Sequence, residues 1–92
     1  MKPIVYTRRA LDHLASHAAA IARDNPAAAR EQVARIRRSI DQLAAFPDMG
    51  RPGRIEGTRE LAAPRTQFVI VYRTEPPRVV ILRVLHGRQK YP

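Results

Sequence analysis

The chain has 92 residues, of which 45% are hydrophobic and 27% are charged, and its formal net charge is +9. A chain of this length holds one small domain, residues 1–92, whose stability without a partner is modest. The apolar content is typical of a folded protein rather than of a disordered chain. Because the sequence contains no cysteine, disulfides, thiolate catalysis and sulfur-ligated metals are excluded.

The positive charge is spread over both halves of the chain and is carried by arginine at every basic position except Lys2 and Lys90. Such a charge favours encounters with nucleic acid, ribosomes or acidic proteins without identifying one of them. The arginine excess fits either a need for planar bidentate donors or the bias of a G+C-rich genome. No leader-like apolar segment follows Lys2, and no apolar run spans a membrane, so we expect a soluble, cytoplasmic protein.

The first half of the chain predicts a strand followed by two helices. Ile4–Tyr6 is a short apolar run, and Thr7 can cap a helix with apolar residues at three-four spacing. Asn25 can cap a second helix, with Pro26 at its first position. That helix ends at Phe46-Pro47. We therefore expect an antiparallel hairpin of two helices, each about 18 to 20 residues long.

The second half predicts three strands. A Gly/Arg loop, residues 50–57, leads into strands at 58–63, 68–73 and 78–86, which are separated by proline-containing turns. Short connections make neighbouring strands antiparallel. The expected fold is α+β with the order β-α-α-β-β-β, a small antiparallel-rich sheet and the helical hairpin packed on one face. The other face of the sheet is left for function.

Strict alternation along the last strand divides its side chains between two largely apolar faces, which predicts a central strand. One face would hold Val80, Leu82, Val84 and His86, and the other Val79, Ile81, Arg83 and Leu85.

Arg59 and Glu60 are neighbours in the first of the three strands, so their side chains point to opposite faces. If Glu60 faces the helices it needs a buried cation, and Arg73 or Arg83 is the expected partner. This structural role competes with any catalytic role of Arg83.

Taken together, these features resemble the ParE/RelE family of toxins from bacterial toxin–antitoxin pairs, over essentially the whole chain. The resemblance lies in the order of elements, in the sequences of residues 57–61 (GTREL) and 69–73 (VIVYR), and in the closing stretch 81–88 (ILRVLHGR). It implies a small α/β toxin that a cognate antitoxin blocks. It also implies one of two targets, DNA gyrase for ParE-like members or mRNA on the ribosome for RelE-like members, and the fold alone does not choose.

Cleavage of mRNA requires a general base, cations around the phosphate and a general acid, but no metal. If the chain is RelE-like, the resemblance points to His86 as base or acid, with Tyr91 stacking on a base or donating a proton. The phosphate ligands would be Arg59, Arg65 and Arg83. The alternative is that His86 merely ends a strand and that Tyr91 packs on the core.

The ParE-like interpretation needs no catalytic set, because a gyrase poison acts within a protein–protein–DNA complex. The long helices favour it. Its target-binding surface would be the Gly/Arg loop with Arg51 and Arg54, or the terminal segment with Arg88 and Lys90. We expect no cofactor and no metal with either target. An inactive member of the family, acting only as an interaction module, is the remaining alternative.

Small and apolar residues on the first helix suggest where an antitoxin helix docks. The predicted contact set consists of Leu14, Ala18, Ala19, Ile21 and Ala22, which would line a groove between the hairpin and the sheet. Alanine also simply favours helix, so a purely structural role stays open.

Two further patterns admit a ligand and a structural interpretation. The glycines of the Gly/Arg loop could let backbone N–H groups converge on a phosphate, although the spacing fits no known phosphate loop. His13 and His17 have metal-binding spacing, but no third ligand is evident. We therefore expect a connector with solvated arginines and two neutral histidines.

Overall fold

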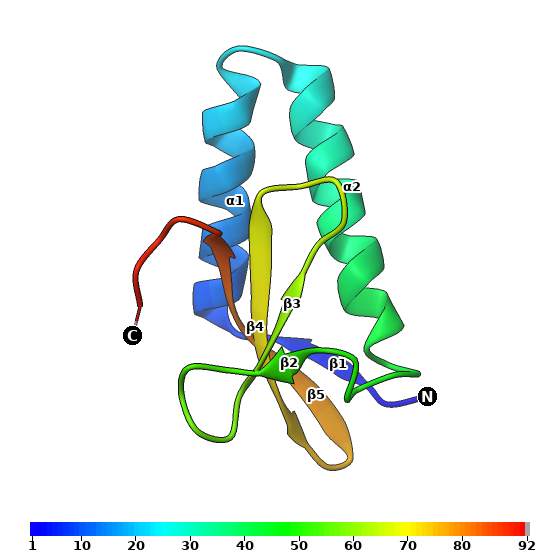
Figure 1. The fold of residues 1–92 in the computed structure, drawn as a ribbon. Coiled ribbons are helices and arrows are strands. Elements are labelled where there is room, and N and C mark those ends of the chain that lie inside the picture. Colours follow the sequence, from blue (N-terminus) through cyan, green and yellow to red (C-terminus); the bar gives the residue numbers. More distant parts are fainter. Residues whose placement is uncertain (92) are drawn as a thin grey trace.

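The computed structural model describes residues 1–91, and Pro92, the last residue of the predicted domain, lies outside the described residues. The elements in chain order are β1 (Ile4–Tyr6), α1 (Arg8–Ala22), α2 (Pro26–Gln42), β2 (Arg51–Pro52), β3 (Arg59–Ala62), β4 (Phe68–Glu75) and β5 (Arg78–His86) (Figure 1). The predicted α+β order is confirmed, with β2 as an additional strand. Part of the Gly/Arg loop forms β2 because Arg51 and Pro52 pair with β3.

Both helices begin where the sequence predicts. The Thr7 side chain accepts a hydrogen bond from the Ala10 N–H at 3.1 Å, and Asn25 Oδ1 accepts one from the Ala28 N–H at 3.0 Å. These caps satisfy N–H groups that have no partner within the helix. The helices contain 15 and 17 residues, and both are shorter than predicted. The first ends at Ala22, and the second ends at Gln42, after which the chain continues in turns before Pro47.

The five strands form one sheet in the order β1-β5-β4-β3-β2. The last strand, β5, is therefore an interior strand, as predicted from its two apolar faces, and it is paired with β1 on one side and β4 on the other. The pairs β2/β3, β3/β4 and β4/β5 are antiparallel, whereas β1 runs parallel to β5. Parallel strands need a long connection, and here the helical hairpin and strands β2 to β4 all lie between β1 and β5 in the chain.

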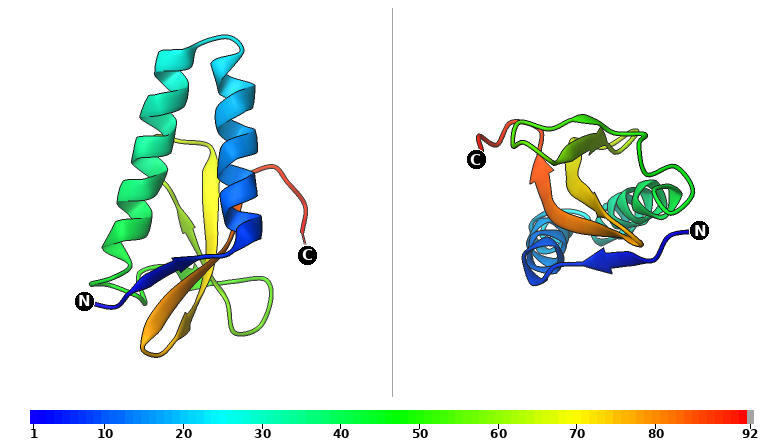
Figure 2. Two further views of the ribbon diagram at one scale, coloured as in Figure 1. Left: turned by 180° about the vertical axis from the view of Figure 1, so that it is seen from behind. Right: turned by 90° about the horizontal axis from the view of Figure 1, so that it is seen from below.

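The two helices cover one face of the sheet, which we call the helix face, and leave the other, the open face (Figure 2). Ile36, Ile40 and Leu43 are at most 1% exposed and pack with Tyr72 and Ile81 from the strands. The loop between β2 and β3 and the tail after β5 lie on the open-face side. Core packing on the helix face thus fixes a sheet whose other face can carry polar groups.

A β-bulge in β5 overturns the predicted division of its side chains. Val71 pairs with Arg83 while the next residue, Tyr72, pairs with Ile81, so Leu82 is an extra, unpaired residue. An extra residue reverses the alternation beyond it. Val79 and Ile81 before the bulge and Val84 after it belong to the core cluster on the helix face, and Arg83 projects from the open face.

Thr7 binds the backbone at the bulge. Its hydroxyl lies 2.9 Å from the Ile81 carbonyl oxygen and 3.2 Å from that of Leu82, and its N–H donates to Ile81. The residue that caps α1 therefore also holds the start of the helix against β5. Among residues 1–91, neither helix has the length and apolarity that crossing a bilayer requires.

Candidate functional site

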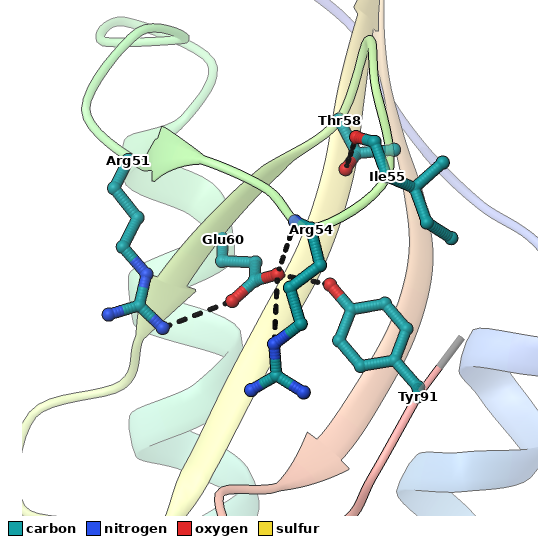
Figure 3. Close-up of polar contacts among 6 residues, drawn as sticks. All are labelled: Arg51, Arg54, Ile55, Thr58, Glu60 and Tyr91. Atoms are coloured by element: carbon teal, nitrogen blue, oxygen red, sulfur yellow. Dashed lines mark hydrogen bonds and ion pairs between the residues drawn. The ribbon is translucent and has the colours of Figure 1, made fainter.

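A buried carboxylate organises the open face. Glu60 on β3 is 3% exposed, and three donors surround it (Figure 3). Arg51 Nη2 lies 3.0 Å from Oε1, the Arg54 backbone N–H donates to Oε2 at 3.0 Å, and the Tyr91 hydroxyl also donates to Oε2. Arg54 Nε is 3.9 Å from Oε2. A strand, a loop and the terminal tail thus meet at one negative charge.

The sheet register explains the first of these contacts. Arg51 on β2 is directly opposite Glu60 on β3, and opposite residues share a face of a sheet. Glu60 in turn is opposite Val71, which places it on the open face. Arg73 or Arg83 was expected as its partner only if Glu60 faced the helices, and that condition is not met. Arg51 and Arg54 balance its charge instead.

The β2–β3 loop is a tight turn that presents an N–H group to this carboxylate. Gly53 donates its N–H to the Thr58 carbonyl at 2.8 Å, and the Thr58 hydroxyl donates to the Ile55 carbonyl at 2.6 Å. Gly57 has φ +82°, a conformation that residues with a side chain rarely adopt. The Gly/Arg loop does bind an anion through its backbone, and that anion is Glu60 of the same chain.

The donors decide the protonation of Glu60. Burial raises the pKa of its carboxyl, but the hydrogen bonds from Tyr91, the Arg54 backbone and Arg51 outweigh burial, so the pKa lies below its usual value of 4.5. Burial, followed by the neighbouring carboxylate, raises the pKa of the Tyr91 hydroxyl. At neutral pH the pair is therefore a phenol donating to a carboxylate.

Tyr91 also packs against cations. Its ring centroid lies 4.8 Å from the Arg54 guanidinium carbon and 5.8 Å from that of Arg83. Such contacts favour a guanidinium over an aromatic face. They hold the tail on the open face and account for Tyr91 by packing and hydrogen bonding.

The predicted RNA-cleavage set does not converge on one point. Arg83 and Tyr91 lie together on the open face. The His86 ring packs edge-on against Phe68, a residue of the core, and its Nε2 lies 2.6 Å from Gln67 Oε1. Arg83 and His86 are three residues apart in a regular stretch of β5 that follows the bulge, so alternation puts them on opposite faces of the sheet.

The two remaining members of that set lie elsewhere. Arg65 lines a groove of about 740 Å³ with His86 and His17, between the tip of the hairpin and the sheet. Arg59 donates to the Gly50 carbonyl at 2.7 Å and lies 3.7 Å from Asp48, where it closes the loop before β2. The five candidates are thus distributed over three places, two of them away from the open face.

The predicted target-binding arginines combine an internal and an external role. The side chains of Arg51 and Arg54 contact Glu60 but stay 68% and 46% exposed. Arg88 and Lys90 are exposed in the tail that carries Tyr91. Arg54 lies in the loop, and Arg88 and Lys90 lie in the tail. Because Glu60 binds both the loop and the tail, the two predicted target-binding surfaces are neighbours.

The predicted antitoxin-binding residues are divided between different surfaces. Leu14 is 5% exposed and belongs to the core, so it is unavailable to a partner in the folded protein. Ile21 lines the groove between the hairpin and the sheet. Ala18, Ala19 and Ala22 instead line a shallow groove of about 600 Å³ whose lining comes only from the two helices. The division arises because α1 presents different faces to the sheet and to α2.

His13 and His17 perform a structural task that the sequence did not reveal. His13 Nδ1 accepts a hydrogen bond from the Val84 N–H at 3.1 Å, and His17 Nε2 lies 2.9 Å from the Val84 carbonyl oxygen. They occupy the edge of β5 beyond the end of β1, where both backbone groups would otherwise be unpaired. Within residues 1–91, no cluster of three metal-ligating side chains is present.

Comparison with known proteins identifies the family to which this chain belongs. A family model described as "ParE toxin of type II toxin-antitoxin system, parDE" matches residues 4–91. The chain is 45% identical over 91 residues to a protein of Sinorhizobium fredii (strain NBRC 101917 / NGR234) named "Putative toxin Y4kP", with 99% of this chain and 94% of that protein covered.

A solved structure shows the same fold. It is titled "Chromosomal ParDE TA system from P. aeruginosa", and the matching chain has a TM-score of 0.83 and 26% sequence identity. The match covers 94% of this chain and 96% of the other.

Proposed function

Since this chain belongs to the ParE toxin family of type II toxin–antitoxin systems, we propose that it inhibits growth by poisoning DNA gyrase and that a cognate antitoxin neutralises it. The match of the ParE family model to residues 4–91 carries this proposal. Gyrase acts on DNA in the cytoplasm, which is accordingly the proposed location. The chain needs no cofactor for this activity.

The geometry supports gyrase over mRNA as the target. Cleavage of RNA requires an acid, a base and phosphate ligands within hydrogen-bonding reach of one phosphodiester. His86 and Arg83 are on different faces of the sheet, and Arg59 closes a distant loop. A poison that acts by binding needs only a complementary surface.

The proposed gyrase-contacting surface comprises the exposed guanidiniums of Arg51 and Arg54 and the tail residues Arg88 and Lys90. Glu60 fixes the positions of the loop and the tail, so these cations are presented in a defined arrangement. Preorganised arginines lose less conformational entropy on binding than mobile ones.

Plasmid supercoiling by purified gyrase tests the proposal. Folded, antitoxin-free protein should reduce supercoiling and trap cleaved, linear DNA, and His86→Ala should retain both effects. The absence of any effect on gyrase would refute the proposed target. Cleavage of mRNA in a ribosome-dependent translation assay, with loss of cleavage in His86→Ala, would favour the alternative RelE-like activity.

We further propose that an antitoxin helix docks in the groove lined by Ala18, Ala19 and Ala22, where small side chains permit close approach. Ala19 and Ala20 are adjacent and exposed, but Ala20 lines the groove between hairpin and sheet instead. Ala19→Phe should weaken antitoxin binding in a calorimetric titration, and Ala20→Phe should not. The reverse result would place the helix between hairpin and sheet.

A further inference from the structure

A pocket of about 440 Å³ lies on the open face and is distinct from the Glu60 cluster and the two helix grooves. Four segments far apart in the sequence form it: the start of α1, the β2–β3 loop, β4 and β5. The residues that matter below are Arg9, Ile55, Glu56, Arg73, Leu82 and Arg83. Pockets at which several elements meet are common ligand sites.

The charge around the pocket is unbalanced. Three arginines and one glutamate line it, which leaves a surplus of positive charge. Arg73 is engaged by Glu75, with Nη2 to Oε2 at 3.0 Å. Within residues 1–91, neither Arg9 nor Arg83 forms a hydrogen bond or an ion pair with a carboxylate, although Arg83 contacts the Tyr91 ring. Two guanidiniums on different elements therefore face the pocket with unused donors.

The position of Arg9 opposes the stability of its own helix. The first turn of α1 contains Arg8 and Arg9 and no acidic residue. The N-terminus of a helix carries partial positive charge, so cations there are unfavourable and an anion would be favourable. Sequences that break a local rule without compensation often do so for function. An anion bound beside Arg9 would offset both the guanidinium and the helix terminus.

The pocket is held in shape by backbone contacts. The Thr7 hydroxyl bonds to the carbonyls of Ile81 and Leu82 fix the start of α1 against the bulge. The Thr58 hydroxyl bond to Ile55 fixes the loop on the opposite side. Leu82, the bulge residue, and Ile55 add apolar surface beside the arginines. The cationic and apolar parts are thus presented together.

We propose that this pocket binds a glutamate or aspartate carboxylate from an acidic segment of the antitoxin, with Arg9 and Arg83 as its ligands and a neighbouring apolar side chain over Leu82 and Ile55. The proposal rests on neutralisation by an antitoxin, proposed above, and adds a second contact to the helix groove. A peptide suits the pocket better than a nucleic-acid backbone, which carries a charge at every phosphate and would meet Glu56.

The test compares a double variant with a matched control. Arg9→Ala/Arg83→Ala removes both unpaired guanidiniums. Arg8→Ala removes the adjacent arginine, whose side chain is 87% exposed and pairs only with Asp12 within the described residues. Affinity for the full-length cognate antitoxin is measured by calorimetry at low and high salt, and the thermal stability of each variant is recorded.

The double variant should bind the antitoxin about 100-fold more weakly, roughly tenfold per lost charge pair, and its affinity should depend less on salt. Arg8→Ala should stay within about threefold of the wild type. Loss of Arg9 relieves an unfavourable charge at the helix N-terminus, whereas loss of Arg83 removes its contact with the Tyr91 ring, so the two changes oppose each other in stability. The recorded melting temperature shows that the double variant is folded at the temperature of the titration, so weaker binding is not a result of unfolding.

Two results would overturn the inference, and they are distinguishable. Equal antitoxin affinity of the wild type and the double variant removes the pocket assignment and leaves neutralisation intact; if the double variant then also loses binding to a short DNA duplex, the pocket is a nucleic-acid site. Failure of the wild type to bind the antitoxin removes the proposed neutralisation, and this inference with it.

Discussion

Replacing Glu60 by glutamine removes a negative charge that holds β3, the β2–β3 loop and the tail together. A glutamine can keep one oxygen toward the Arg54 N–H and Tyr91, but it then presents an NH₂ group to Arg51. Two hydrogen bonds lose their charge assistance, and a largely exposed ion pair is lost. With about 0.5–1 kcal/mol for each of these changes, the free energy of unfolding should fall by about 2 kcal/mol at pH 7.

Urea denaturation at pH 7 measures this loss, and a decrease of 2 kcal/mol corresponds to a melting temperature lower by roughly 10 °C. Glu56→Gln is the matched control, because Glu56 is exposed in the same loop and should change stability by less than about 0.5 kcal/mol. Equal unfolding free energies for wild type and Glu60→Gln would refute the view that these donors hold a stabilising charge.

Acid titration gives a second readout of the same residue. The folded pKa of Glu60 is lowered, so its contribution is complete above about 4.5 and is lost as the pH falls through the folded value. Glu60→Gln should therefore lose less stability than the wild type on acidification. Some loss should persist, since hydrogen bonds from Arg78 and Arg73 also lower the pKa of Glu75. Identical acid profiles would contradict the assignment.

Two further outcomes are expected. Burial, followed by the nearby charges of His17, Arg83 and Arg9, lowers the pKa of His13 below 6.5. Its contribution to the free energy of unfolding is therefore present above about pH 6.5 and is lost as the pH falls below that value, so His13→Gln should flatten the profile of stability against pH, measured with urea, between about pH 7 and pH 5. An equal flattening in His86→Gln would contradict this assignment to His13. Gly50→Ala would place a methyl group 2.7 Å from the buried Tyr72 hydroxyl, so the free energy of unfolding should fall by about 1–3 kcal/mol. Gly87→Ala is the control, because the nearest atom to its new methyl group is 3.4 Å away, and its free energy of unfolding should change by less than about 0.5 kcal/mol.

The tertiary structure changed the predicted site more than the predicted fold. The bulge at Leu82 moved Arg83 to the open face, because one extra residue reverses the alternation on which the assignment relied. The partners of Glu60 could not be found locally, since Tyr91 is 31 positions away and reaches it only through the path of the tail. His13 and His17 were recognised as a pair, but their partner, Val84, is set by how α1 lies on β5.

The sequence by itself determined the helix caps at Thr7 and Asn25, the three main strands and the interior position of β5. Hydrogen bonds and apolar patterns within a few residues decide these features. It was also enough to identify the family, because each helix and strand can be predicted from its own residues and their order along the chain is characteristic of the family. Only the tertiary structure decided which arginines meet Glu60, which residues line each groove and which cations stay unpaired. Those depend on strand register and chain path, and a shift of one residue in either moves a side chain to the opposite face of the sheet.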